Sequence, residues 1–260
     1  MNSKLNIFTI CLDGAPYIGS HLPVLNTLKI NWHWTIAEGV ATNVKDTAWC
    51  SRQTPRLSRD GTTEYLNAIR NHPRVTVLKK QSWEGKVAQV NACLAGIDSP
   101  GILLQMDVDE IWSAKQLETL VEFFNAYPKI RSAEFYCRFF VGPNIIITSL
   151  DSYATKPGDW HRAWRFEPGM KFLKHEPPVL NGVTDPRASR EATKECGLVF
   201  EHWAYALESQ VRFKEAYYGY HNAVQHWRRL QANTIWPVLD LKGFLPWVGD
   251  GVTADLLFNL

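Results

Sequence analysis

The sequence predicts an α/β fold with a central, mainly parallel sheet flanked by helices. In the first half of the chain, short apolar runs alternate with segments of helical periodicity. In the second half, strand-like pairs precede a helical C-terminal tail. A chain of 260 residues can bury the core of one such domain. Because strand and helix alternation is typical of parallel sheets, we expect that sheet beside a smaller antiparallel β region.

Four strands, each followed by a helix, are expected in the first half. The apolar runs that predict the strands are 6–12, 33–37, 74–78 and 101–106. The helices expected after them cover 16–28 with a kink at Pro23, a segment around 65–69 that ends before Pro73, 83–95, and 114–127 behind a capping box at Ser113 and Gln116. The polar, aperiodic stretch 40–59 predicts a mobile loop that can fold over a ligand.

The second half of the chain is predicted to contain hairpins. Residues 133–140 and 144–148 form one strand pair around Gly142-Pro143, and residues 160–166 and 170–174 form another around Pro168-Gly169. A polar loop through about Lys194, a strand at 197–200 and helices from 207 to about 232 complete it. We expect one domain with a donor-binding half, 1–128, and an acceptor-side half, 129–260.

Composition limits the possible partners. The formal net charge of +2 gives no basic field for nucleic acid. Five cysteines without any Cys-x-x-Cys spacing favour a reduced cytoplasm. No signal-peptide layout opens the chain, and no apolar run is long enough to cross a bilayer. Most of the eleven tryptophans should pack in the core, and a minority is left to stack on a ligand.

The strongest functional signal is Asp107-Val-Asp109-Glu110, which follows the apolar run 101–106. The last residues of such a strand reach the carboxyl edge of the sheet, where α/β proteins bind ligands. Two aspartates separated by one residue can aim their oxygens at one hard cation, and that cation can neutralise a diphosphate. A bare Asp-x-Asp is common by chance, so the motif needs support from its context.

Two further residues are expected at the same edge. Glu38 follows the second strand, where it either holds the polar rim of a base or ribose or serves as a loop acid. Lys86 lies near a helix start, where its ammonium either reaches an anionic ligand or remains solvated. Asp60, in Ser58-Arg-Asp-Gly-Thr62, is more typical of a helix cap.

Together these segments resemble the family 2-like glycosyltransferases of the nucleotide-sugar-binding GT-A fold, over roughly residues 5 to 220. The resemblance depends on an ordered series of motifs. They are Phe8-Thr-Ile-Cys-Leu-Asp13, Ile36-Ala-Glu38-Gly39, Ser58-Arg-Asp-Gly-Thr62, Lys86 with Asn91, and Gln105-Met-Asp-Val-Asp-Glu110.

The resemblance implies roles for several residues. Leu12, Asp13, Glu38 and Lys86 would lie at the donor nucleotide. Asp109 would be the firmest ligand of Mn²⁺ or Mg²⁺, while Asp107 would touch the ribose or reach the metal through water. His-Glu-Pro-Pro at 175–178 and Phe-Glu-His-Trp at 200–203 look like motifs of a subgroup in which a late histidine completes the metal site. We expect His202 in that role, with His175 as its competitor.

This sequence departs from the family pattern in two places. The loop 40–57 stretches the distance between the second-strand acid and Asp60, and the downstream Glu-Asp pair that marks the acceptor-side base is absent. An inverting enzyme needs a carboxylate within hydrogen-bond reach of the acceptor hydroxyl. Glu176 is the first candidate because two prolines follow it, Asp185 is the second and Glu201 the third. Trp160, Trp164 and Trp203 offer flat faces to an acceptor sugar, although core packing is the commoner fate of tryptophan.

The predicted function is metal-dependent transfer of a sugar, of hexosyltransferase type, from a nucleotide-diphosphate sugar to an acceptor hydroxyl. Inversion and a role in glycan or polysaccharide synthesis are expected. Two alternatives are a nucleotidyltransferase and a non-catalytic nucleotide-sugar-binding module. The first normally has a basic, Gly-rich phosphate loop after its first strand, and Leu12-Asp-Gly-Ala-Pro16 has no Lys or Arg.

Overall fold

Residues 3–43, 46 and 48–259 are described by the computed structural model of the protein. The chain forms two compact units, and each of them combines two separate stretches of sequence. The first unit consists of residues 1–136 and 160–200, and the second consists of residues 137–159 and 201–260. The expected donor and acceptor halves, divided at residue 128, concern function and stay a prediction.

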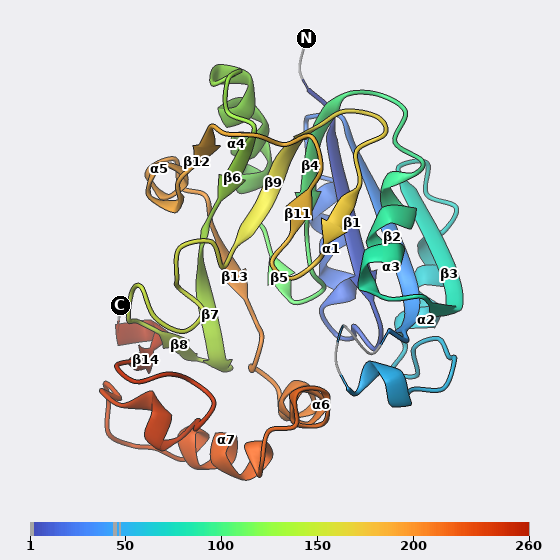
Figure 1. Ribbon diagram of the computed structural model, residues 1–260. Coiled ribbons are helices and arrows are strands. Elements are labelled where there is room, and N and C mark those ends of the chain that lie inside the picture. The colour runs from blue at the N-terminus through green and yellow to red at the C-terminus, as the bar shows by residue number, and fades with distance from the viewer. Residues whose placement is uncertain (1–2, 44–45, 47, 260) are drawn as a thin grey trace. The chain divides into compact units, whose positions relative to one another are not determined.

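A seven-stranded sheet in the order β12-β6-β9-β4-β1-β2-β3 forms the centre of the first unit (Figure 1). Strands β3, β2, β1 and β4 run parallel, as do β12 and β6, whereas β9 runs antiparallel to β4 and β6. The mainly parallel sheet predicted from the sequence is therefore confirmed. Its strands are β1 (Leu5–Cys11), β2 (Trp32–Ala41), β3 (Val75–Trp83), β4 (Gly101–Gln105), β6 (Ser132–Glu134), β9 (His161–Phe166) and β12 (Arg187–Ala188).

Helices separate the parallel strands along the chain, as predicted. They are α1 (Ile18–Leu25), α2 (Thr62–Ile69), α3 (Lys86–Leu94) and α4 (Ala114–Ala126), and the short η1 (Cys50–Arg52) and α5 (Arg190–Glu195) also belong to this unit. In Figure 1, α3 lies in front of the sheet. The predicted capping box of α4 is confirmed, because Ser113 Oγ accepts from the Gln116 amide and Gln116 Oε1 accepts from the Ser113 amide.

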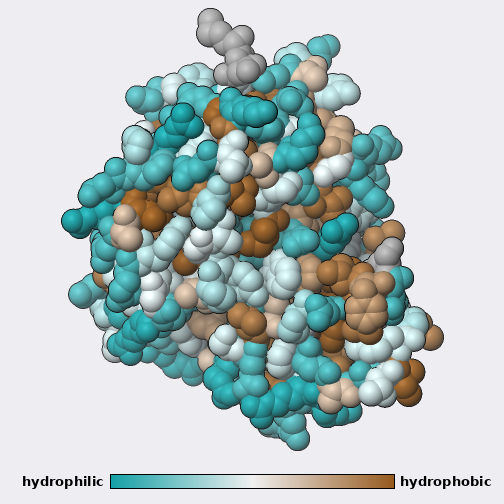
Figure 2. Space-filling view, turned by 180° about the vertical axis from the view of Figure 1, so that it is seen from behind, coloured by the Kyte–Doolittle hydropathy of each residue, from teal (hydrophilic) through white to brown (hydrophobic). Residues whose placement is uncertain are grey.

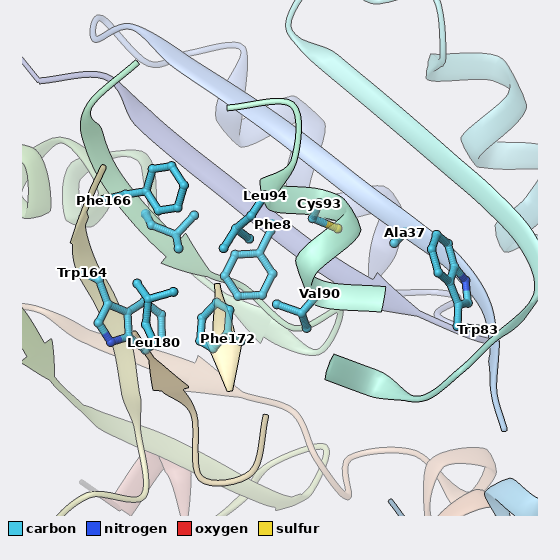
Figure 3. Packing of buried hydrophobic residues seen from close by; sticks show 11 residues of the cluster. Phe8, Ala37, Trp83, Val90, Cys93, Leu94, Trp164, Phe166, Phe172 and Leu180 are labelled. Atoms are coloured by element: carbon cyan, nitrogen blue, oxygen red, sulfur yellow. The ribbon is translucent and has the colours of Figure 1, made fainter. Parts of the chain in front are cut away.

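A cluster of buried apolar side chains joins the sheet to α3 and to the hairpin of β10 (Phe172–Lys174) and β11 (Val179–Leu180) (Figure 3). Phe172 is central to it, with its ring 5.4 Å from that of Phe8 and 5.3 Å from that of Trp164. Each fully buried side chain of this size contributes roughly 1.5–3 kcal/mol. The cluster therefore fixes the β10–β11 hairpin against α3.

The predicted hairpin of residues 160–166 and 170–174 is wrong. β9 pairs with β4 and β6 in the main sheet, whereas β10 pairs with β11 in a separate two-stranded sheet. The successive residues Ala163 and Trp164 are both fully buried. Because neighbouring residues of a strand point to opposite faces, β9 is covered on both faces, which suits a place inside a sheet.

The second unit contains an antiparallel β region and the helical tail, as predicted. β7 (Tyr136–Gly142) and β8 (Ile145–Ile147) form the expected hairpin, and β8 also pairs with β14 (Ala254–Leu256). The tail helices are α6 (Glu208–Tyr218) and α7 (Ala223–Gln231), and η2 (Leu241–Gly243) and η3 (Leu257–Asn259) follow. β13 (Val199–His202) crosses the boundary between the units.

Hydrophilic side chains cover most of the face shown in Figure 2, and apolar side chains lie among them in small groups. Within the described ranges, no helix combines the length and the apolar character that crossing a membrane requires. Large apolar side chains of the first unit lie in its core. Four of them are almost completely buried: Trp32, Trp34, Trp112 and Trp164.

Candidate active site at the carboxyl edge of the sheet

Three carboxylates and one arginine lie where the main chain leaves β4. Asp107 and Asp109 are partly exposed, whereas Glu110, in the short β5 (Glu110–Ile111), is fully buried. We call Asp107, Asp109 and Glu110 the acidic corner. Arg162 of β9 donates from Nε to Glu110 Oε1 at 2.9 Å, and its Nη2 lies 3.4 Å from Asp107 Oδ2. Arg162 therefore holds two of the three carboxylates.

Arg162 balances these charges inside the protein. Burial alone would lower the pKa of its guanidinium, but Glu110 and Asp107 raise that pKa above its ordinary value, so the side chain stays protonated. Burial raises the pKa of Glu110 above its ordinary value, although Arg162 opposes the rise. The main-chain amide of Asp107 donates to the second Glu110 oxygen at 3.3 Å, so both oxygens accept hydrogen bonds. This pattern is that of an ionised carboxylate paired with arginine.

Helix α1 holds the main chain between the two aspartates. His21 Nε2 lies 3.0 Å from the carbonyl oxygen of Val108. Burial lowers the pKa of His21 to about 4, so its ring is neutral and can donate this hydrogen bond. Burial, and next the charge of Asp109, raise the pKa of Tyr17 to about 12. The acidic corner is therefore fixed from the side of α1 as well as by Arg162.

The donor set at this corner fits a hard divalent cation. Asp107 and Asp109 supply partly exposed carboxylate oxygens, which Mg²⁺ and Mn²⁺ prefer. Among residues 3–43, 46 and 48–259, no group of three His, Cys, Asp or Glu side chains has the arrangement of a metal site. A cation held here would therefore need ligand oxygens beyond the two aspartates.

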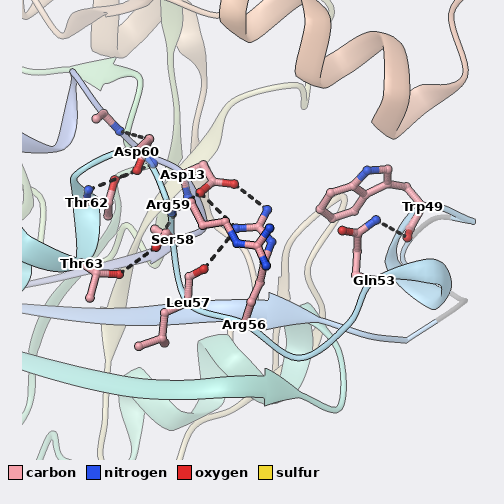
Figure 4. Close-up of polar contacts among 12 residues, drawn as sticks. Asp13, Trp49, Gln53, Arg56, Leu57, Ser58, Arg59, Asp60, Thr62 and Thr63 are labelled. Carbon is pink, nitrogen blue, oxygen red and sulfur yellow. Dashed lines mark hydrogen bonds and ion pairs between the residues drawn. The ribbon is translucent and has the colours of Figure 1, made fainter.

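The loop after β1 is tied to residues 56–62 (Figure 4). The Asp13 carboxylate accepts from Arg56 Nη2 at 2.6 Å and from the Arg59 amide at 2.8 Å. The amides of residues 13–15 donate in turn to Ser58 Oγ, Thr62 Oγ1 and Asp60 Oδ2, at 2.8–3.0 Å. Asp60 also accepts from the Thr62 amide at 3.1 Å at the start of α2, although the N-cap residue of that helix is Gly61 and not Asp60.

Glu38 lies inside β2, because that strand continues to Ala41 instead of ending at Ala37 as predicted. Its side chain is fully buried, and Oε1 accepts from the Ser58 amide at 3.1 Å and from the Thr63 hydroxyl. Within the described part of the chain, Oε2 has no hydrogen-bond partner. Asp13 and Glu38 thus both anchor residues 56–63, and their contacts with a nucleotide, like that of the half-buried Leu12, stay predictions.

Lys86 lies at the start of α3, as predicted, and reaches the turn 175–178 between β10 and β11. Its Nζ donates to Glu176 Oε1 at 3.0 Å. Partial burial would raise the pKa of Glu176, but Lys86 and then His175 outweigh this and lower it below its ordinary value. Glu176 is therefore an ionised partner of Lys86 and has a reduced tendency to accept a proton.

The remaining predicted site residues are Asp185, Glu201 and His202. Asp185 is exposed in the segment before β12. His202 and Glu201 belong to the second unit, where His202 is buried edge-on against Phe139 at 5.0 Å. Their roles stay predictions. The tryptophans expected as sugar platforms pack against other side chains: Trp164 is fully buried, Trp203 stacks on Phe140 at 4.0 Å, and Trp160 lies under Arg162 at 4.9 Å.

Sequence reasoning did not single out Arg162 or Arg56. A signal for Arg162 was available, because it alternates with the buried Trp164 on one face of an apolar strand. A charged residue at such a position needs a buried partner. Arg56 lies in an aperiodic loop, where no pattern indicates a partner.

The model of glycosyl transferase family 2 matches residues 57–189, just over half of the 260 residues. The chain belongs to glycosyl transferase family 2. The matched stretch of this family 2 chain contains the acidic corner, Lys86, Arg162 and the turn 175–178, while Asp13, Glu38 and His202 lie outside it. No curated protein sequence matches the chain.

Solved structures similar to this family 2 chain include glycosyltransferases. S. aureus TarS 1–349 in complex with UDP-GlcNAc is 14% identical over 54% of this chain and 36% of that chain, with a TM-score of 0.41. The mannosyltransferase PcManGT from Pyrobaculum calidifontis, in complex with GDP-Man and Mn²⁺, is 17% identical over 53% and 36%, with a TM-score of 0.41. S. aureus TarS 1–349 without a named ligand is 12% identical over 82% and 63%, with a TM-score of 0.44. Each alignment spans less than two thirds of the other protein.

Proposed function

We propose that this protein transfers a sugar, of hexosyl type, from a nucleotide-diphosphate sugar to a hydroxyl group of a sugar or glycan acceptor. The observation that supports this most is the family 2 match, which covers the acidic corner at the end of β4. Open α/β sheets bind their ligands at this edge. We further propose that the transfer inverts the anomeric carbon and serves glycan or polysaccharide synthesis. The five cysteines, which have no Cys-x-x-Cys spacing, fit the cytoplasm as its compartment.

The donor would bind along the carboxyl ends of β1, β2 and β4. Leu12, Asp13, Glu38 and Asp107 are the proposed contacts of its nucleoside. Lys86 is the proposed contact of the diphosphate, because its ammonium lies at the N-terminus of α3, where the helix dipole also favours an anion. In the structure Lys86 pairs with Glu176, so a bound diphosphate would compete with that carboxylate.

Asp107 and Asp109 are the proposed protein ligands of Mn²⁺ or Mg²⁺, together with His202. A cation at this corner supplies charge stabilisation for the departing nucleoside diphosphate, whose negative charge grows in the transition state. Arg162 supports this arrangement in two ways. It pairs with Asp107, and it compensates the charge of the buried Glu110. Glu176 and Asp185 are the carboxylates that we propose to lie near the acceptor hydroxyl.

The proposal is tested with Asp109→Asn and a donor screen. UDP-, GDP- and dTDP-sugars are supplied with and without Mn²⁺, and released nucleoside diphosphate is measured. We expect metal-dependent release by the natural protein and at least a roughly hundredfold slower release by Asp109→Asn, with unchanged circular dichroism. Asp98→Asn, an exposed aspartate outside the cluster, should behave as the natural protein does.

Two results would contradict the proposal. Full metal-dependent turnover by Asp109→Asn would remove the acidic corner from the chemistry. Tight binding of a nucleotide sugar by the natural protein, without nucleoside diphosphate release for any acceptor, would instead identify a binding module.

A further inference from the structure

His175 is buried without a hydrogen-bond partner. It follows β10 directly, and only 6% of its surface is exposed. Neither ring nitrogen has a hydrogen-bond partner within the described part of the chain. Buried polar atoms in folded proteins are nearly always hydrogen-bonded, so a buried imidazole without such a bond calls for an explanation, and a catalytic role is one that the principle allows.

Four charged side chains from four parts of the first unit act on this ring. They are Lys86 of α3, Asp107 after β4, Arg162 of β9 and Glu176 in the same turn. Burial is the largest influence and lowers the pKa of His175; Lys86 and Arg162 lower it further, while Asp107 and Glu176 oppose them. At neutral pH the imidazole is therefore neutral, and one of its nitrogens has a lone pair that can accept a proton.

The carboxylate of Glu176 lies near Nδ1 of the His175 ring. His175 Nδ1 is 3.7 Å from Glu176 Oε1. A carboxylate at this nitrogen favours the tautomer with the proton on Nδ1 and balances the charge that the ring gains when Nε2 takes a second proton. The arrangement is thus that of a neutral histidine with an anionic neighbour on the side away from its free lone pair.

The turn that carries His175 is held at two points of one helix. The Asn91 side chain of α3 accepts from the Phe172 amide at 2.8 Å and donates to the Phe172 carbonyl at 3.0 Å. Five residues earlier on α3, Lys86 donates to Glu176. Because Phe172 is also fixed in the core cluster, the imidazole has a defined place relative to the acidic corner.

We infer that His175 is the catalytic base of the proposed transfer, with Glu176 as its positioning residue. This inference rests on the proposed function. The acceptor oxygen forms a bond to the anomeric carbon, and the bond from that carbon to the diphosphate oxygen breaks. Its electron pair leaves with the nucleoside diphosphate. The hydroxyl proton moves to His175 Nε2 and from there to solvent.

The test compares His175→Asn with the natural protein in the presence of Mn²⁺. UDP-GlcNAc and GDP-mannose serve as donors, p-nitrophenyl glycosides serve as acceptors, and both the transfer product and the nucleoside diphosphate are measured. We expect kcat to fall by about 10²–10⁴-fold, with the KM for the donor unchanged. Imidazole added to His175→Ala should restore part of the rate, which it would not do for a residue with a purely structural role.

Glu176→Gln tests the positioning role. We expect a smaller fall in kcat and a shift of its acidic limb to lower pH, because Glu176 is one of the two groups that raise the pKa of His175. His33→Asn is the matched control, since His33 lies at the start of β2 and its Nε2 forms a hydrogen bond with the Thr76 hydroxyl at 2.9 Å. It should leave kcat and the imidazole response unchanged.

The outcomes separate this inference from the function on which it rests. If no donor is consumed by the natural protein, the proposed function fails and the base assignment fails with it. Normal transfer by His175→Asn, while the natural protein is active, would overturn only the base assignment. Loss of Mn²⁺ binding in His175→Asn, measured by electron paramagnetic resonance, would overturn it in favour of a metal ligand.

Discussion

At the scale of single residues, Arg162 compensates the buried charge of the acidic corner. It is 8% exposed and pairs with a carboxylate that is fully buried. Removing one partner of a buried ion pair leaves the other charge without compensation, which typically costs about 3–5 kcal/mol. We therefore expect Arg162→Met to lose about that much free energy of unfolding, measured by urea denaturation.

Two variants serve as controls for this prediction. Arg138→Met removes an arginine that is 58% exposed and pairs with Glu201 at 3.7 Å, so we expect a loss below about 1 kcal/mol. The double variant Glu110→Met with Arg162→Met replaces the whole pair by apolar groups and should recover most of the stability. Equal losses in Arg162→Met and Arg138→Met would show that the buried pair is not the cause.

At the scale of elements, β2 depends on a glycine next to Glu38. Gly39 has φ +132°, at an irregularity in the pairing of β2 with β3, and an added Cβ would lie 1.8 Å from the carbonyl oxygen of Lys80. Any side chain here must displace main chain in a position that L residues rarely adopt. We expect Gly39→Ala to destabilise the protein by about 3 kcal/mol, and to weaken donor binding because Glu38 moves with the strand.

Gly96→Ala is the matched control for Gly39→Ala. An added Cβ at Gly96 meets nothing within 4 Å and the residue has no positive φ, so its urea midpoint should stay the same or rise slightly. A Gly39→Ala protein that unfolds at the same urea concentration as Gly96→Ala would show that the bulge can relax, and would remove this constraint on Glu38.

Elements with a local signal could be predicted from the sequence. The period of apolar residues and the Ser113–Gln116 capping box depend on neighbours within one or two turns, and α3 and α4 formed where expected. The partner of a strand is decided by burial between distant segments, so β9 was misplaced into a hairpin with β10. The pairing of Arg162 with the acidic corner follows from that placement and could not be predicted without it.

At the scale of the whole molecule, the predicted metal ligands belong to different units. Asp107 and Asp109 lie in the first unit and His202 in the second. The first unit also contains Lys86, Arg162, His175 and Glu176, so most of the predicted site comes from one unit. Loops and strand ends of a single scaffold commonly carry such residues.

The contribution of the second unit is tested by His202→Ala and a Mn²⁺ titration in the presence of UDP. If His202 completes the metal site, its removal takes away one of about three protein ligands, and we expect the Kd for Mn²⁺ to rise at least about tenfold. His221→Ala, an exposed histidine of the same unit, is the control and should leave the Kd unchanged. Since His202 packs on Phe139, a thermal scan of both variants separates lost ligation from lost packing. A Kd equal to that of the control would remove His202 from the metal site and leave Asp107 and Asp109 as the proposed ligands.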